Sequence, residues 1–221
     1  MKTTGATAKI GEGIYTAADA ARILKIPYSK ANYWFKYYLK NKHFKTDYRY
    51  YFEVSDILAV NFLTLIEMYV FYAFKEESVK IADIIIAHET ISKTFDTPYP
   101  FANKDFYVSG RKIYYGDDKD LTIANKTKQK MLADILIQFS KKIEYGNANL
   151  AHKYYPLGKN KSIVVDPENQ FGQPVIEGTN IRVETIYNFY KAGDSIELIC
   201  ELYNISNNNV KDAIEFFSMA A

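Results

Sequence analysis

The sequence holds little cysteine and no long apolar run. Cys200 is its one cysteine, so no internal disulfide can form and nothing calls for an oxidising compartment. Residues 1–6 lack the apolar stretch of a signal peptide. The longest apolar run, 62–74, is interrupted by Thr64 and Glu67 and is too short to cross a bilayer. These absences predict a soluble, cytoplasmic protein with no membrane partner.

Signatures of catalysis are also scarce. The histidines lie far apart in the sequence and none adjoins the cysteine, so no zinc-ligand spacing is present; they are His43, His88 and His152. The glycines at 11–13 are too few for a phosphate-cradling loop, and no Gly-x-Ser-x-Gly motif occurs. We therefore expect no enzyme, no cofactor and no metal, and keep an enzyme assembled from distant carboxylates as the third hypothesis.

The charge is divided unevenly along the chain. The 221 residues are 48% hydrophobic and 24% charged, which suits a globular protein with a core. The net charge of +2 conceals that residues 1–54 hold ten Lys and Arg against four Asp and Glu. The remaining residues hold eighteen against twenty-two. A basic head on an acidic body is typical of a nucleic-acid-binding module joined to a partner-binding body, although a solvated basic face is the plainer interpretation.

A pair of short helices is predicted near the N-terminus. Thr16 is a good N-cap, and small apolar residues follow it at helical spacing up to Leu24. Pro27 ends this segment, and Ser29 is expected to cap a second helix over 30–40. Two helices with so tight a connection predict a helix-turn-helix. The aromatic and basic segment 44–52 then predicts a small β-hairpin, or wing.

The second helix offers polar groups suited to DNA. Trp34 and one or two tyrosines are expected to face inward, while lysines, tyrosine and asparagine face outward toward phosphates and base edges. Lysines and arginine of the wing would hold the flanking backbone. The predicted DNA-binding residues are Ser29, Lys30, Asn32, Tyr33, Lys36, Lys40, Lys42, Lys45 and Arg49. The alternative is that the tyrosines only pack and the lysines are only solvated.

The rest of the chain predicts a mainly α fold with small β-hairpins (α+β). We expect a buried helix over 56–74 capped by Ser55, a helix from Ser78 to about 95, and a loop with a hairpin over 96–120. A helix over 125–145 and strands over 161–165 and 171–181 follow. Three short helices close the chain, at 183–191, 195–202 and 207–217, with Gly193 in a left-handed position. The expected domains are 10–54, 55–158 and 159–221.

Three parts of the sequence resemble known families. The run Tyr-Thr-Ala-Ala-Asp-Ala-Ala-Arg-Ile-Leu-Lys-Ile-Pro at 15–27, with Trp34, is similar to the winged helix-turn-helix start of MerR-like regulators. The C-terminal runs resemble the domain-of-unknown-function family 433; they are 166–167, 171–181, 183–186, 192–196, 203–206 and 213–215. Together with 62–67 and 154–157, they resemble the long VapB-type antitoxins of type II toxin–antitoxin modules.

The resemblance implies a non-enzymatic antitoxin. It would bind a PIN-like ribonuclease toxin, block its active site and repress the shared operon by binding operator DNA, as a homodimer or a higher hetero-oligomer with the toxin. Small members of family 433 are themselves thought to be helix-turn-helix antitoxins, which gives a second candidate set: Asn207, Asn208, Asn209 and Lys211. Ordinary helix capping is the plainer interpretation of that asparagine run. The second hypothesis is a free-standing transcription regulator whose middle domain senses a small ligand.

Overall fold

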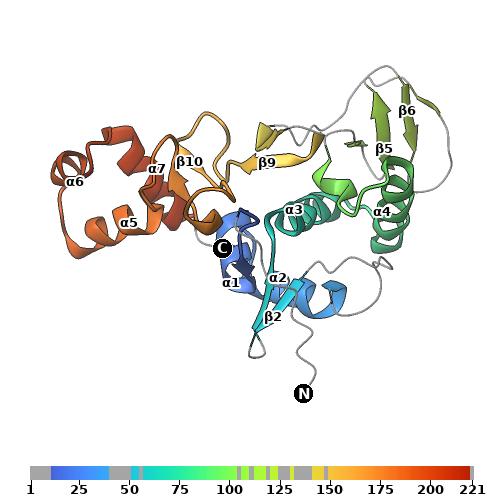
Figure 1. Ribbon diagram of the computed structural model, residues 1–221, viewed down its shortest axis with the longest axis horizontal. Helices are drawn as coiled ribbons and strands as arrows, with labels where there is room; N and C mark the ends of the chain where they lie inside the picture. Colours follow the sequence, from blue (N-terminus) through green and yellow to red (C-terminus); the bar gives the residue numbers. More distant parts are fainter. Residues whose placement is uncertain are drawn as a thin grey trace.

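The computed structural model has three parts arranged along an extended molecule. It describes residues 11–39, 51–54, 57–103, 106–109, 112–117, 120–123, 130–131, 141–146 and 149–219. The C-terminal helices form one end, the middle region forms the other, and the N-terminal head lies beneath their junction (Figure 1). The mixture of helices and small antiparallel sheets agrees with the predicted α+β class. Among the described residues, no helix is long and apolar enough to cross a membrane.

The head combines two short helices with a small sheet. Helix α1 (Ala17–Leu24) begins at Thr16, as predicted, with a capping box in which Thr16 and Asp19 bind each other's backbone. Helix α2 (Tyr28–Trp34) continues into a π-helical turn, η1 (Phe35–Leu39). Strands β1 (Tyr15–Thr16), β3 (Ile57–Val60) and β2 (Tyr51–Val54) form an antiparallel sheet in that order.

Two predicted N-caps in this part are wrong. Helix α2 begins at Tyr28, directly after Pro27, so Ser29 lies in its first turn rather than at its cap. Residues 57–60 form strand β3 rather than the start of a helix, and Asn61 caps the helix that follows instead of Ser55. Periodicity cannot separate a short apolar strand from the helix it leads into. Strands β2 and β3 pair in antiparallel fashion, while residues 44–50 of the predicted wing lie outside the described residues.

The middle region is built on two long helices. Helix α3 (Phe62–Glu76) is buried along most of its length, as predicted, and α4 (Ile81–Phe95) packs beside it and the short helix η2 (Pro100–Ala102). Ser78 does not cap α4: its φ of 60° is left-handed, and the helix starts after Lys80. The buried Glu67 carboxylate accepts hydrogen bonds from the backbone amides of Phe101 and Ala102, at 2.7 and 3.1 Å. It also lies 3.0 Å from His88 Nε2.

The helix predicted over 125–145 is wrong at 130–131 and 143–145, where the structure has strands. A four-stranded antiparallel sheet contains β4 (Phe106–Ser109), β5 (Lys112–Asp117), β6 (Asp120–Ile123) and β7 (Lys130–Met131). Strand β8 (Ile143–Tyr145) then pairs with β9 (Ala151–Tyr154). These strands depend on partners distant in sequence, which local periodicity does not report. Residues 124–129 and 132–140 lie outside the described part.

The C-terminal unit follows the prediction closely. Strands β10 (Ile163–Val164) and β11 (Val175–Ile176) pair in antiparallel fashion, and the short helix η5 (Gln170–Gly172) lies between them in the sequence. Helices α5 (Val183–Ala192), α6 (Ile196–Tyr203) and α7 (Asn207–Ser218) come next. Ser195 and Ser206 are N-caps, and Gly193 takes the left-handed conformation with φ of 104°.

The described residues contain a large core, a smaller core in the C-terminal helices and a cluster of Tyr155, Val164 and Val175. The large core joins the head and the middle region: Tyr15, Trp34, Phe74 and Tyr154 all belong to it. The C-terminal helices have their own core around residues such as Phe216. The head and the middle region are therefore continuous in packing. The boundaries 10–54, 55–158 and 159–221 stay predictions.

Candidate functional site

The outer face of α2 carries the predicted DNA-contacting side chains. Ser29, Lys30, Tyr33 and Lys36 are exposed, and Asn32 is half-buried. The inner face is Ala31, Trp34 and Phe35. Phenylalanine at 35 therefore occupies the place that we expected tyrosine to share with Trp34. Tyr33 and Tyr37 lie outside and stack on each other, with ring centroids 4.3 Å apart.

The charge around this helix has one sign. Between residues 20 and 46 the sequence contains no Asp or Glu, so this stretch is cationic throughout. The remaining predicted contacts lie outside the described residues: Lys40, Lys42, Lys45 and Arg49. Lysines can bind backbone phosphates by charge, and tyrosine hydroxyls can donate hydrogen bonds to the same phosphates.

A groove runs beside the same helix. It has a volume of about 610 Å³ and separates α2 from α3. Lys25, Lys30 and Lys75 contribute cations to its lining, Tyr33 and Tyr72 contribute aromatic rings, and Glu76 contributes the carboxylate. The Tyr72 hydroxyl donates to the Lys30 carbonyl at 2.6 Å. That hydrogen bond ties the outer helix of the head to the buried helix of the middle region.

The second candidate set, at the start of α7, is largely explained by capping. Asn209 Oδ1 accepts a hydrogen bond from the Ser206 amide at 2.9 Å, and the Asn209 amide donates to Ser206 Oγ at 3.2 Å. This capping box confirms the plainer interpretation for Asn209. Asn207, Asn208 and Lys211 are exposed beside it.

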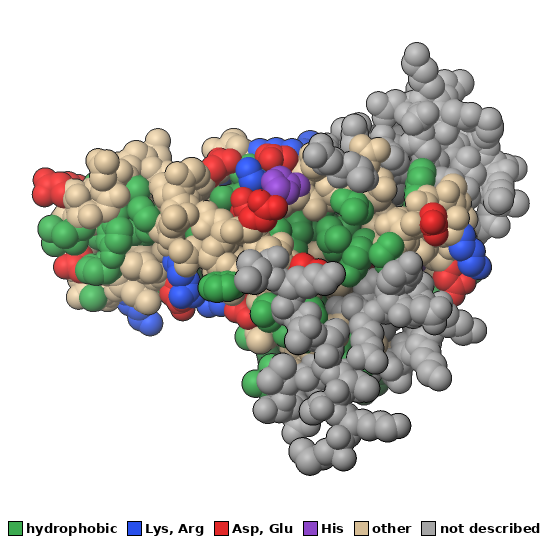
Figure 2. Space-filling model, in the orientation of Figure 1, with side chains coloured by type: hydrophobic (Ala, Val, Ile, Leu, Met, Phe, Trp, Pro, Cys, Tyr) green, Lys and Arg blue, Asp and Glu red, His purple; other side chains and the backbone are tan. Residues whose placement is uncertain are grey.

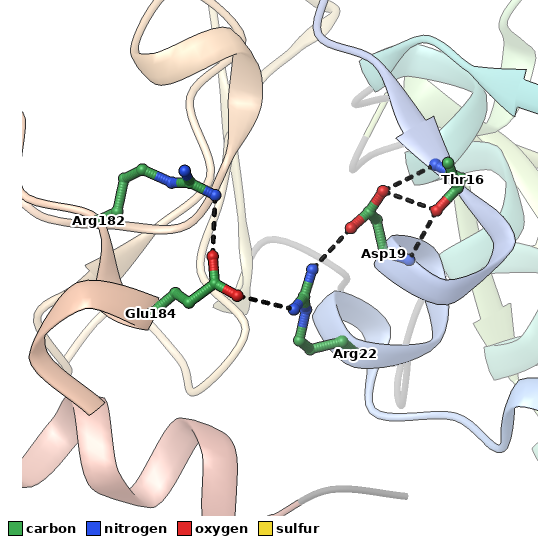
Figure 3. A network of polar contacts seen from close by, with 5 residues as sticks. All are labelled: Thr16, Asp19, Arg22, Arg182 and Glu184. Atoms are coloured by element: carbon green, nitrogen blue, oxygen red, sulfur yellow. Dashed lines mark hydrogen bonds and ion pairs between the residues drawn. The ribbon is translucent and has the colours of Figure 1, made fainter. Parts of the chain in front are cut away.

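Arg22 connects the head with the C-terminal unit (Figure 3). Its Nη2 lies 2.6 Å from Asp19 Oδ1, within the α1 capping box. On the other side, Nη1 lies 3.9 Å from Glu184 Oε1 of α5, and Glu184 also pairs with Arg182 at 3.0 Å. The network is partly exposed, so its contribution to stability is modest. It nevertheless orients Arg22 toward protein rather than toward solvent.

Lys25 makes the second connection. Its Nζ lies 3.6 Å from the centroid of the Phe216 ring and donates to the Phe216 carbonyl near the end of α7. Burial, with the nearby charges of Arg22 and Lys142, lowers the pKa of Lys25 to about 8. No local sequence pattern marks Arg22 for its contact with Glu184 or Lys25 for its contact with Phe216, because each of these partners is more than a hundred and fifty residues away.

A buried carboxylate fastens α7 to β10. Asp212 accepts hydrogen bonds from the Ser162 amide and hydroxyl, both at 2.9 Å, and from Lys161 Nζ at 3.0 Å. Burial by itself would raise the pKa of Asp212, but these hydrogen bonds outweigh burial and hold it below its ordinary value. Among the described residues, no group of His, Cys, Asp and Glu is arranged to hold a metal ion.

Comparisons with known proteins agree with this architecture. Residues 163–217 match the family model described as "Protein of unknown function (DUF433)". The chain is 23% identical over 167 residues to "Putative antitoxin VapB45" of Mycobacterium tuberculosis, with 70% of each chain covered. The crystal structure of Rv2018 from Mycobacterium tuberculosis shares the fold: the TM-score is 0.65 at 18% identity, over 90% of this chain and 96% of that one.

Proposed function

We propose that this protein is the antitoxin of a type II toxin–antitoxin module. The supporting observation is the extent of its similarity to "Putative antitoxin VapB45", since 167 matched residues reach well beyond the C-terminal segment 163–217. The antitoxin would bind and neutralise a PIN-like ribonuclease toxin without catalysing a reaction. It would assemble as a homodimer or as a larger complex with the toxin.

In this proposal the head binds operator DNA and represses the operon. The support is the exposed cationic face of α2, with Lys30 and Lys36 beside exposed tyrosines and no acidic residue between 20 and 46. The acidic remainder of the chain would then hold the toxin. The similarity to a protein named as an antitoxin does not favour the alternative, a free-standing ligand-sensing regulator.

Co-expression with the product of the adjacent open reading frame tests the antitoxin role. We expect that product alone to arrest growth, and co-expression to restore growth and give a complex that co-purifies. An adjacent product that is harmless and does not co-purify would contradict the proposal.

Two lysines test the DNA-binding face. We expect the double variant Lys30→Ala with Lys36→Ala to weaken binding to all DNA sequences alike and to reduce the salt slope by about 2, roughly one for each phosphate contact. Binding is measured by fluorescence anisotropy with a duplex from upstream of the gene. Lys211→Ala, at the exposed start of α7, is the control. If this control weakens binding while the double variant does not, DNA contact belongs to the C-terminal unit.

A further inference from the structure

Helix α6 (Ile196–Tyr203) packs Ile196, Ile199, Cys200 and Tyr203 against the C-terminal core, yet its two leucines lie outside that contact. Six of its eight residues are hydrophobic, but only Ile199 is buried. Leu198 and Leu202 are 42% and 58% exposed. Figure 2 shows hydrophobic side chains gathered at this end of the molecule, with acidic ones beside them. A small domain that leaves two leucines of one helix in water has an unpartnered face there.

The exposed leucines form a continuous surface. Leu198 and Leu202 are four residues apart and so lie one above the other on the helix. We call Leu198 and Leu202, with the glutamates described next, the α6 surface. Apolar side chains form the fully buried centre of protein–protein interfaces.

The charge of the α6 surface has one sign. Glu197 and Glu201 are both exposed, also four residues apart, and α6 contains no Lys or Arg. In the described part of the chain, no cation forms an ion pair with either of them. The other carboxylates of this unit differ, since Asp212 and Glu215 bind Lys161. An occupant of the α6 surface must therefore bring both apolar contact and positive charge.

We infer that the α6 surface binds the cationic, RNA-facing surface of the toxin. This inference rests on the proposed function, because an RNA-cleaving partner needs positive charge to hold its phosphate backbone. The α6 surface offers that partner complementary carboxylates around an apolar centre. A second copy of this chain fits less well, because an α6–α6 contact would bring together four glutamates with no cation from either helix.

Charge and apolar variants of the α6 surface test the inference in the full-length chain. We expect Glu197→Lys with Glu201→Lys to weaken the complex with the adjacent gene product by roughly 10- to 100-fold, through like-charge repulsion. Leu198→Ser with Leu202→Ser is expected to weaken it about tenfold or more. Glu168→Lys, at an exposed carboxylate outside the α6 surface, is the control for the charge reversal. Affinity is measured by surface plasmon resonance, and circular dichroism checks that every variant is folded.

The outcomes separate the surface from the proposed function. If the wild-type chain binds the gene product and α6 variants bind equally well, the α6 surface is wrong while the antitoxin role stands. If the wild-type chain binds no such product, both are overturned. If the glutamate reversal leaves the complex intact but changes the mass of the chain alone in sedimentation, a second copy occupies the surface and the inference fails.

Discussion

The head and the C-terminal unit are both built from short capped helices, but their exposed helix faces carry opposite charge. Each packs short helices joined by tight connections, and each contains a helix that opens with a capping box, at Thr16 in the head and Ser206 in the C-terminal unit. The exposed face of α2 carries lysines and tyrosines. The exposed face of α6 carries leucines and glutamates. Similar backbone arrangements thus present one surface suited to phosphate and another suited to protein.

Under the proposed function, a pair of short helices with a tight connection does not by itself identify a DNA-binding element. Duplex DNA repels carboxylates as strongly as it attracts lysines, so the sign of charge on the outward face decides between partners. Arg22 and Lys25 illustrate the same point from within the head. They contact Glu184 and Phe216 of the C-terminal unit, and so they join the head to that unit.

The largest expected change in the free energy of unfolding comes from variants that remove a large side chain from one core. Phe216→Ala should destabilise the C-terminal unit by about 3–5 kcal/mol, because Phe216 is fully buried and its loss leaves a cavity. Trp34→Ala should cost the head a similar amount. Since the two residues belong to separate cores, hydrogen exchange should show each loss mainly in its own unit.

Leu202→Ala serves as the control for both core variants. It is exposed, so we expect its free energy of unfolding to stay within about 0.5 kcal/mol of the wild type. Equal loss of amide protection in both units for either core variant would show that the chain unfolds as one body, and would remove the distinction between them.

The second effect is smaller and depends on pH. The pKa of Asp212 is held down in the folded protein, so its stabilising contribution is present above the unfolded pKa of about 3.9 and is lost as the pH falls through the folded value. We expect Asp212→Asn to lower the free energy of unfolding by about 1–3 kcal/mol at neutral pH. Urea titrations at several pH values should show this gap closing in acid. A gap independent of pH would contradict the assigned role of the carboxylate.

The smallest expected loss of stability comes from replacing the N-cap residues of α1 and α7, which allows the two caps to be compared. Thr16→Ala and Ser206→Ala should each cost about 1 kcal/mol, since each leaves the first turn of a helix with an unsatisfied amide. We expect the larger loss at Thr16, because its partner Asp19 also binds Arg22 at the junction. Thermal unfolding of the matched pair measures the difference, and a larger loss at Ser206 would mean that the junction adds nothing to the α1 cap.

The sequence predicted the elements whose signals are local. Thr16, Ser195 and Ser206 are capping residues followed by helical periodicity, and Gly193 supplies a left-handed stop; all four are where we expected them. The exposure of Lys30 and its neighbours on α2 also follows from helical spacing around a buried tryptophan.

Features that depend on distant partners could not be predicted. The helix expected over 125–145 gave way to β8, which exists because β9 pairs with it. Strand β3 was missed because its apolar residues are followed at once by those of α3. Lys25 contacts Phe216 across 191 positions of the chain, and no local pattern marks either residue for that contact. The exposure of Leu198 and Leu202 likewise becomes visible only once the three helices have packed.

Hydrogen exchange in two complexes tests most directly whether α2 binds DNA and α6 binds the protein partner. The full-length chain is compared alone, with a duplex from upstream of its gene, and with the product of the adjacent open reading frame. We predict that DNA protects the segment from Tyr28 to Leu39 and leaves Ile196–Tyr203 unchanged, whereas the protein partner does the reverse. Protection of the start of α7 by DNA, or of α2 by the protein partner, would contradict the assignment.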